Sequence, residues 1–329
     1  MISKELIDEV TRGDRNIAAL LEQKNSKSPQ TQTQPNPSFE EMVTQRVAEP
    51  PKLVQPNPKR HQVFEVLRLA VGAKVNVFLV GPAGSGKTTV AKQVAQSLGL
   101  PFYFNGAIQS EYKLTGFRDA QGKVHRTAFR DAFERGGVYL FDEIDASQPA
   151  ALLAFNAALA NGMFDFPDRN VQCHHNFRCI AAANTWGRGA TIDYVGRSAL
   201  DAATLDRFAT LEMRYDPALE RRMAQIAAKG DNNLAAGWLE VVQKTRAMCI
   251  EHDLRHIVSP RATQQGLSLM TGGITAEGAT IMVLRRGLDD TSWGRIRPRI
   301  HALVEQVEMA RKAMLSRNKT GGSEDNIHG

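Results

Sequence analysis

The stretch Gly81-Pro82-Ala83-Gly84-Ser85-Gly86-Lys87-Thr88 decides the fold of this chain. An apolar run over 75–80 precedes it, and a run of helical character over 89–98 follows it and ends at Gly99. Strand, glycine loop and helix, in that order, are the context that a phosphate-binding loop requires. The glycines let backbone N–H groups surround a polyphosphate, and the helix N-terminus adds the positive end of its dipole. The sequence therefore predicts a site for a nucleoside triphosphate.

Two side chains at the end of this loop have the chemistry to contact a bound nucleotide directly. Lys87 is expected to reach the β- and γ-phosphates, and the hydroxyl of Thr88 is expected to bind Mg²⁺. ATP and Mg²⁺ are therefore the predicted cofactors. The predicted cofactor-binding residues are Gly81, Pro82, Ala83, Gly84, Ser85, Gly86, Lys87, Thr88 and Thr89.

An acidic pair follows a second apolar strand. Val138-Tyr139-Leu140-Phe141 runs directly into Asp142-Glu143, and acidic groups at the end of a buried strand are costly unless they have a function. Beside a phosphate loop, Asp142 is expected to hold Mg²⁺ together with Thr88. Glu143 is expected to polarise the attacking water as general base. The pair predicts hydrolysis of ATP to ADP and phosphate in addition to binding.

A third strand, 177–183, ends at Asn184, whose amide can orient the water against the γ-phosphate. A lone Asn after a strand is more often an ordinary turn residue. With Asn184 added, the set resembles the AAA+ ATPases over roughly 60–270. More narrowly it resembles the MoxR-type ATPases and the ATPase subunit of cobalt chelatase, in the helix-2-insert clade.

The resemblance implies roles for two arginines. Leu205-Asp206-Arg207-Phe208 is similar to a family element whose arginine acts across a subunit boundary, so Arg207 is the implied finger. Ser259-Pro260-Arg261 resembles the sensor 2 site, which implies that Arg261 contacts the γ-phosphate. Each arginine alone would more often be an ordinary surface residue. Arg197 is a second, lower-ranked finger candidate.

The same resemblance implies an assembly and a task. A finger that serves a neighbour's ATP requires head-to-tail contacts, and such contacts form a ring when they close, here a predicted hexamer. The implied function is remodelling of a protein partner, and the resemblance makes a protein with a von Willebrand factor type A domain the first candidate. Hairpins are predicted within 113–127 and 164–173, and in the family such loops face a central pore. Two surface loops without substrate contact are the alternative.

The order of elements predicts an α/β fold followed by a smaller all-helical domain. Alternating strands and helices over 59–215 favour a parallel sheet with helices on both faces, the P-loop NTPase architecture. Helical patterns at 218–228, 234–252, 261–270 and 300–316 predict a lid domain over 216–316. The remaining segments are predicted as an amphipathic arm (1–24), a flexible linker (25–58) and a disordered tail (317–329).

Composition limits the other classes of function. In 329 residues, 42% of them apolar, no apolar run approaches the roughly 18 residues of a membrane span. The charged N-terminus is unlike a secretory signal, and three cysteines give no disulfide framework, so a cytoplasmic location is expected. The net charge of +6 permits a nucleic-acid partner without requiring one, so a nucleic-acid motor is the alternative function.

Overall fold

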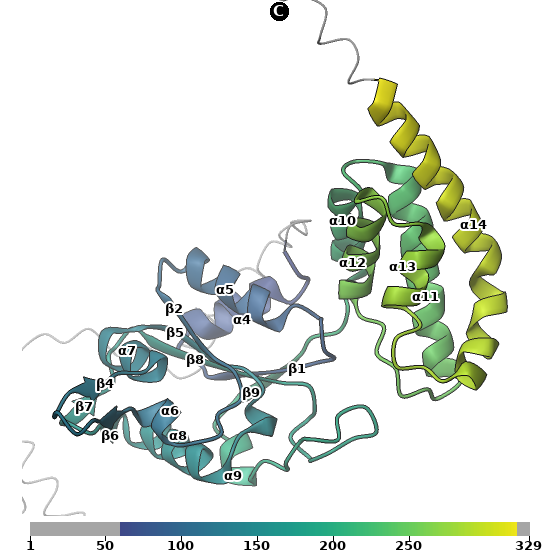
Figure 1. The fold of residues 1–329 in the computed structure, drawn as a ribbon. Helices are drawn as coiled ribbons and strands as arrows, with labels where there is room; N and C mark the ends of the chain where they lie inside the picture. Colours follow the sequence, from purple (N-terminus) through teal and green to yellow (C-terminus); the bar gives the residue numbers. More distant parts are fainter. Residues whose placement is uncertain (1–59, 321–329) are drawn as a thin grey trace, which may run out of the picture. The chain divides into compact units, whose positions relative to one another are not determined.

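The computed structural model describes residues 60–320, with side chains described through residue 317. The predicted arm, the predicted linker and residues 321–329 of the predicted tail lie outside the described residues. Figure 1 shows a sheet with helices on both faces, and a group of helices formed by the C-terminal part of the chain. In this described part, no helix has both the length and the apolar character needed to cross a membrane.

The central sheet is parallel throughout and has five strands in the order β2-β5-β8-β1-β9. Its strands are β1 (Val77–Val80), β2 (Phe102–Asn105), β5 (Gly137–Phe141), β8 (Phe177–Ala183) and β9 (Ala209–Glu212). Val80 pairs with Ala183, and Phe141 pairs with Ala181. The glycine loop, the acidic pair and Asn184 therefore all follow the same edge of the sheet. The predicted parallel sheet is confirmed.

Both faces of the sheet are buried over its central strands β5, β8 and β1, which explains why these strands are continuous apolar runs. Along β1, Val77 and Leu79 enter one hydrophobic cluster, whereas Phe78 and Val80 enter the other. The first cluster is covered by α4 (Phe64–Gly72) and α5 (Lys87–Ser97). The second is covered mainly by α7 (Ala128–Arg135) and α8 (Pro149–Asn161). Shorter elements are α6 (Tyr112–Thr115), η1 (Ile144–Ala146) and α9 (Ala202–Leu205).

Two short hairpins project from the sheet domain, as the sequence predicts. One is formed by β3 (Phe117–Arg118) and β4 (Val124–His125), the other by β6 (Met163–Asp165) and β7 (Asn170–Gln172). The first is shorter than expected because residues 112–115 form a helix, which ends at Gly116 with φ of 82°. That left-handed backbone is easily adopted by glycine, so the chain turns there before the strand begins.

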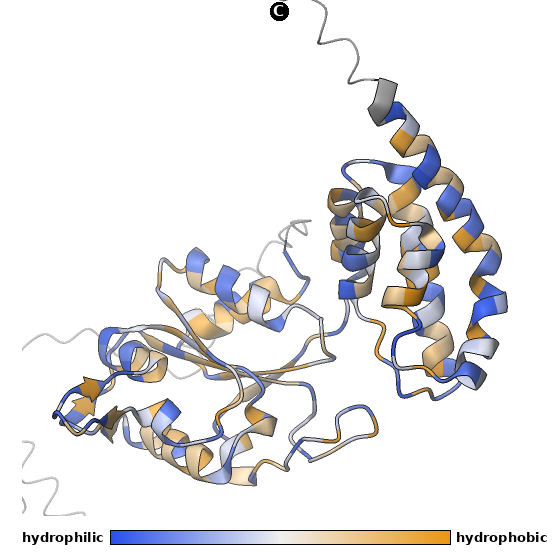
Figure 2. Ribbon diagram, viewed as in Figure 1, coloured by the Kyte–Doolittle hydropathy of each residue, from blue (hydrophilic) through white to orange (hydrophobic). Residues whose placement is uncertain are grey.

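The C-terminal helices have a hydrophobic core of their own, built around the fully buried Trp238. They are α10 (Pro217–Ala227), α11 (Asn232–Glu251), α12 (Pro260–Thr271), α13 (Ala276–Val283) and α14 (Asp290–Thr320). Figure 2 shows hydrophilic and hydrophobic residues alternating along α14, the pattern of a helix with one buried face. This all-helical region corresponds to the expected lid, and the boundary at 215 and 216 stays a prediction.

Two features of the helical region differ from expectation. Helix α13 is not predicted because its eight residues are too few to show a clear period. Helix α14 begins ten residues before the expected Ile300 and contains Pro298. An interior proline costs about 3 kcal/mol, but Trp293 and Ile296 are buried in the helical core and offset that cost. The helix also continues to Thr320, past the start of the expected tail.

Candidate active site

The glycine loop leaves β1 and enters α5 through two residues with left-handed backbone. Gly84 has φ of 79° and Gly86 has φ of 96°, values that a side chain makes unfavourable. A Cβ atom on Gly84 would lie 2.7 Å from both Cβ and Oγ of Ser259, so the loop also needs glycine for its approach to α12. Helix α5 begins at Lys87, and its free N–H groups point toward the loop.

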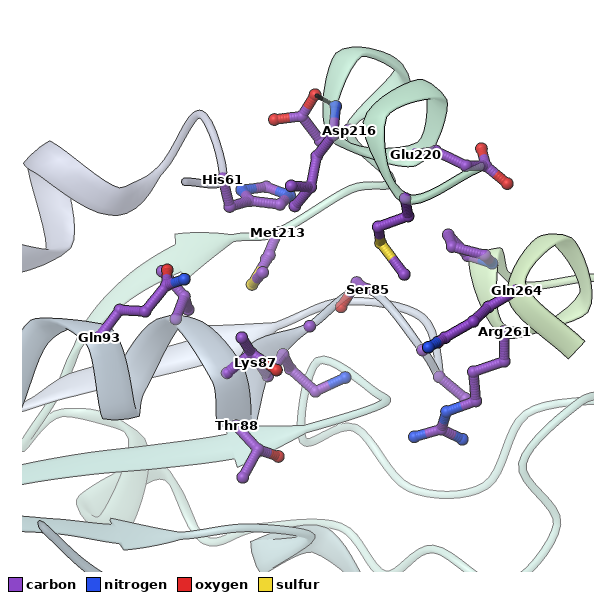
Figure 3. Close-up of a pocket in the computed structure, with 18 of the residues that line it drawn as sticks. His61, Ser85, Lys87, Thr88, Gln93, Met213, Asp216, Glu220, Arg261 and Gln264 are labelled. Atoms are coloured by element: carbon purple, nitrogen blue, oxygen red, sulfur yellow. Dashed lines mark hydrogen bonds between the residues drawn. The ribbon is translucent and has the colours of Figure 1, made fainter. Parts of the chain in front are cut away.

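A cavity of about 560 Å³ lies over this helix N-terminus. Figure 3 shows Ser85, Lys87 and Thr88 on one side of it, with Arg261 and Gln264 of α12 facing them. Of the predicted site residues, the structure brings residues 83–89, Asp142, Glu143, Asn184 and Arg261 to this cavity. Gly81 and Pro82 stand behind it, where their carbonyl groups contact Lys87.

Three acceptors hold the Lys87 ammonium at the loop. It donates to the carbonyl oxygens of Gly81 (2.7 Å) and Pro82 (3.1 Å) and to Oδ1 of Asn184 (2.9 Å). Only 7% of the residue is exposed. Burial lowers the pKa of Lys87 to about 8, although the nearby Asp142 carboxylate opposes this shift. The N–H donors of Lys87 therefore lie at the loop, where phosphate oxygens can replace their present acceptors.

Thr88 and Asp142 meet at the mouth of the same cavity. The Thr88 hydroxyl donates to Oδ2 of Asp142 at 2.8 Å, and Oδ1 of Asp142 accepts the Glu143 backbone N–H at 2.9 Å. Hydroxyl and carboxylate oxygens are hard ligands, and Mg²⁺ commonly takes one or two such protein groups beside substrate phosphates and water. The two residues therefore fit the predicted metal, and their role as ligands stays a prediction.

Glu143 also lines the cavity, with a backbone φ of 53° and a carboxylate that contacts an arginine of the same chain. Its Oε1 lies 3.1 Å from the guanidinium of Arg197. The other end of that guanidinium lies 3.1 Å from Oδ1 of Asp145, whose side chain is fully buried. Sequence reasoning missed Asp145, although its position two residues after Glu143 was a visible signal. Arg197, a finger candidate from the sequence, sits on its own chain's carboxylates.

Arg261 and Arg207, the two arginines expected to act on ATP, lie in different places. Arg261 follows the N-terminal cap Ser259 of α12 and lines the cavity. Arg207 does not line it within the described chain, and its guanidinium donates instead to the carbonyl oxygen of Ala203. The structure therefore brings Arg261 to the glycine loop of its own chain and leaves Arg207 away from it.

Two tyrosines that the sequence did not single out bracket Ala83 in the loop. The Ala83 N–H donates to the Tyr194 hydroxyl at 2.9 Å, and the Tyr215 hydroxyl donates to the Ala83 carbonyl oxygen at 2.9 Å. Burial raises the pKa of Tyr215 to about 12, so its hydroxyl stays protonated and able to donate. The far end of the cavity, toward His61 and Met213, was missed as well.

Comparisons with known proteins show similarity to one family, to several curated proteins and to solved structures. Residues 76–208 match the family model of the AAA domain, dynein-related subfamily. An uncharacterized protein of Staphylococcus epidermidis is 28% identical over 165 residues, which are 46% of this chain and 60% of that protein. A shikimate kinase of Actinobacillus pleuropneumoniae is 34% identical over 82 residues, 24% of this chain and 43% of the kinase. The chain thus spans about 60% of the length of its staphylococcal relative.

Among solved structures, NtrX from Brucella abortus is similar with a TM-score of 0.47 and 17% identity, covering 70% of this chain and 51% of that one. NtrX in complex with ATP is similar with a TM-score of 0.47 and 16% identity, covering 76% and 56%. The finer resemblance to MoxR-type ATPases and the cobalt chelatase subunit stays a prediction. The family match spans the glycine loop, the Asp142-Glu143 pair and Asn184, which all follow strands of one parallel sheet, so over residues 76–208 this chain is similar to the AAA domain of that subfamily.

Proposed function

We propose that this protein is an ATPase that hydrolyses ATP to ADP and phosphate with Mg²⁺. One observation carries the proposal: Lys87, Glu143 and Asn184, which follow three different strands, converge on one cavity. A lysine at a helix N-terminus serves to bind phosphate. A carboxylate and an amide at the same place are the groups that hydrolysis adds, because water must be oriented and must lose a proton.

Each group has a separate task in this proposal. Thr88 and Asp142 would hold Mg²⁺, which when bound supplies positive charge against the phosphate oxygens. Lys87 exchanges its carbonyl contacts for phosphate oxygens, and Arg261 adds a second positive charge from α12. Asn184 orients the water, and Glu143 accepts its proton.

We further propose that the protein acts as a ring, a hexamer, in which Arg207 serves the neighbouring subunit's nucleotide. The placement of Arg207 away from its own cavity supports this assignment. A guanidinium fixed against the transferring phosphoryl group neutralises charge that develops in the transition state. Head-to-tail contacts that close on themselves give such a site at every interface.

The proposed task is remodelling of a protein partner, with a von Willebrand factor type A protein as the first candidate because of the resemblance to MoxR-type ATPases. The two hairpins, each with one exposed large apolar residue (Phe117 and Met163), are the proposed contact with this partner, because such loops face a central pore in the family that the sequence resembles. Stimulation of turnover by DNA, with a steep salt dependence, would favour the alternative of a nucleic-acid motor.

Two variants test the ATPase proposal. Lys87→Ala is expected to lose ATP binding, whereas Glu143→Gln is expected to keep binding and stop turnover, because phosphate contact and water activation fall on different residues. Lys92→Ala and Glu240→Gln, on exposed positions of α5 and α11, are the matched controls and are expected to behave as wild type. Normal turnover in Glu143→Gln would show that the assignment of the base is wrong. Proteins that co-purify with Glu143→Gln in ATP would be the first partner candidates.

A further inference from the structure

We infer that Arg197 is a positioning residue for hydrolysis: it fixes the carboxylate of Glu143 within the same subunit, and Asp145 in turn fixes Arg197. The inference rests on the proposed ATPase function and adds to it two residues and a direction of action, cis instead of trans. It starts from one guanidinium that bridges two carboxylates only two residues apart in the sequence.

The geometry gives Arg197 little freedom. Its Nη2 atom lies 3.1 Å from Oε1 of Glu143, and its Nη1 atom lies 3.1 Å from Oδ1 of Asp145. The Arg197 side chain is 13% exposed and that of Asp145 is 0% exposed. A buried carboxylate that loses its cation is strongly destabilised. Arg197 therefore cannot swing toward a neighbouring subunit without leaving Asp145 unpaired in the interior.

Asp145 is itself held at several points. Its Oδ2 accepts hydrogen bonds from the Thr185 hydroxyl (2.8 Å) and the Thr185 backbone N–H (3.3 Å). Its backbone carbonyl accepts the N–H of Ser198 at 2.7 Å, which pins the loop beside Arg197. Thr185 directly follows Asn184, so one buried carboxylate joins the end of β8, the arginine and the segment that carries Glu143. A charge-assisted network of this kind is rigid because each member is satisfied.

The carboxylate of Glu143 needs a partner to fix its position. Its side chain is 46% exposed and has several rotatable bonds, so alone it would sample many positions over the cavity. Within residues 60–317, Arg197 is the partner with which its carboxylate forms an ion pair. Fixing the base before the substrate arrives removes an entropic cost from the reaction, and misplacing it by about 1 Å can lower the rate about 100-fold.

The two arginines of this region thus have opposite assignments. Arg197 contacts two carboxylates of its own chain, whereas the guanidinium of Arg207 contacts the Ala203 carbonyl and lies away from its own cavity. We expect Arg197 to act on the nucleotide site of its own subunit and Arg207 on the next one. This difference can be measured in mixed rings.

Kinetics of the full chain test the positioning role first. Arg197→Ala is expected to lower kcat for ATP roughly 10- to 100-fold and to change KM less than about twofold, because phosphate contacts stay intact. Arg197→Lys is expected to recover part of kcat, since an ammonium keeps the charge but cannot bridge both carboxylates. A rise in kcat for Arg197→Ala would overturn the inference by showing that the contact restrains the base. A joint loss of kcat and ATP affinity, with neither recovered in Arg197→Lys, would show a merely structural role and overturn it too.

Mixing experiments then test the direction. Arg197→Ala subunits mixed with Lys87→Ala subunits are expected to show no activity above the residual turnover of Arg197→Ala, because no subunit then has both an intact loop and a fixed Glu143. Arg207→Ala mixed with Lys87→Ala is the positive control, in which recovery is expected. Recovery in the Arg197 mixture would overturn the cis assignment. Normal turnover in Glu143→Gln would instead refute the proposed base, and this result is independent of the Arg197 kinetics.

Discussion

The ammonium nitrogen of Lys87 lies 2.9 Å from Oδ1 of Asn184, at the point where β1 and β8 end side by side in the sheet. The contact joins residues that are 97 positions apart in the chain. It also shows what a nucleotide must displace, because the same ammonium has to turn from backbone and amide oxygens to phosphate. The affinity for ATP therefore depends on the charge state of Lys87 before binding.

We expect ATP affinity to weaken above pH 8. Burial lowers the pKa of free Lys87 to about 8, whereas bound phosphate favours the charged form and raises that pKa. Below pH 8 Lys87 is already charged and takes up no proton when ATP binds. Above pH 8 it takes up as much as one proton from the solvent on binding. The dissociation constant should be flat below pH 8 and rise by up to about tenfold per pH unit above it. Titration of ATP into the protein with EDTA, from pH 6.5 to 9.5, measures this profile without metal.

The matched control for that profile is Lys87→Arg, which stays charged over the whole range. Only the slope of its dissociation constant against pH is compared with wild type, because the different shape of the guanidinium changes the absolute affinity. A wild-type profile that stays level to pH 9.5 would contradict the role of Lys87 deprotonation.

Removing the proposed finger should affect turnover without affecting binding. Arg207→Ala is expected to lower kcat by ~10³ or more, since the lost charge acts in the transition state. ATP affinity should stay near wild type, because Arg207 does not line the cavity of its own chain in the part that the structure describes. Fluorescent-nucleotide titration and phosphate release measure the two quantities. An equal loss of affinity would argue that Arg207 contacts the ground-state nucleotide.

The first hairpin should be dispensable for folding and necessary for coupling to a partner. Its tip, residues 118–122, is held mainly by Asp119, which accepts N–H groups of Gln121 and Lys123 and contacts His125. Replacing 118–122 with a short Gly-Ser turn removes contacts that are almost all within the hairpin. We expect normal ATP binding and assembly, with loss of partner-stimulated turnover.

Leu114→Ala, at the base of the same segment, is the contrasting variant. Leu114 is fully buried, so the change should lower the free energy of unfolding by about 2–5 kcal/mol. If the Gly-Ser replacement lowers stability as much as Leu114→Ala does, the tip is structural and its proposed contact with a partner is wrong.

A glycine in the C-terminal helical region tests the packing around Trp238. A Cβ atom on Gly266 of α12 would lie 2.1 to 2.4 Å from three atoms of the buried indole, so a methyl group cannot be added without displacement. Gly266→Ala is expected to lower the free energy of unfolding by about 1–3 kcal/mol. Gly294→Ala in α14 meets no atom within 4 Å and should raise it by about 0.5–1 kcal/mol. Chemical denaturation of the two variants gives both values, and an unchanged stability of Gly266→Ala would mean that the core of the helical region is loosely packed.

The parts of this protein that the sequence predicts are those whose chemistry lies in a local pattern. The glycine loop, the Asp142-Glu143 pair and Asn184 each follow an apolar strand, and parallel strands bring such ends to one edge. The contacts of Arg197 and Tyr215 carry no such pattern, because they join residues 52 to 132 positions apart. They depend on how loops and lid pack after the sheet has formed. Helix α14 shows the same limit, since burial of its apolar face offsets the local cost of Pro298.

The place of β1 in the sheet has a consequence for how the chain folds during synthesis on the ribosome. Strand β1 ends at Val80, yet its two neighbours, β8 and β9, begin only at Phe177 and Ala209. The roughly hundred residues between β1 and β8 take about 5 to 20 s to synthesise. During that interval Val77–Val80 has neither of its sheet neighbours, and an unpaired apolar strand is prone to aggregate. The nascent chain therefore depends on other means of shielding β1 until β8 and β9 have been synthesised.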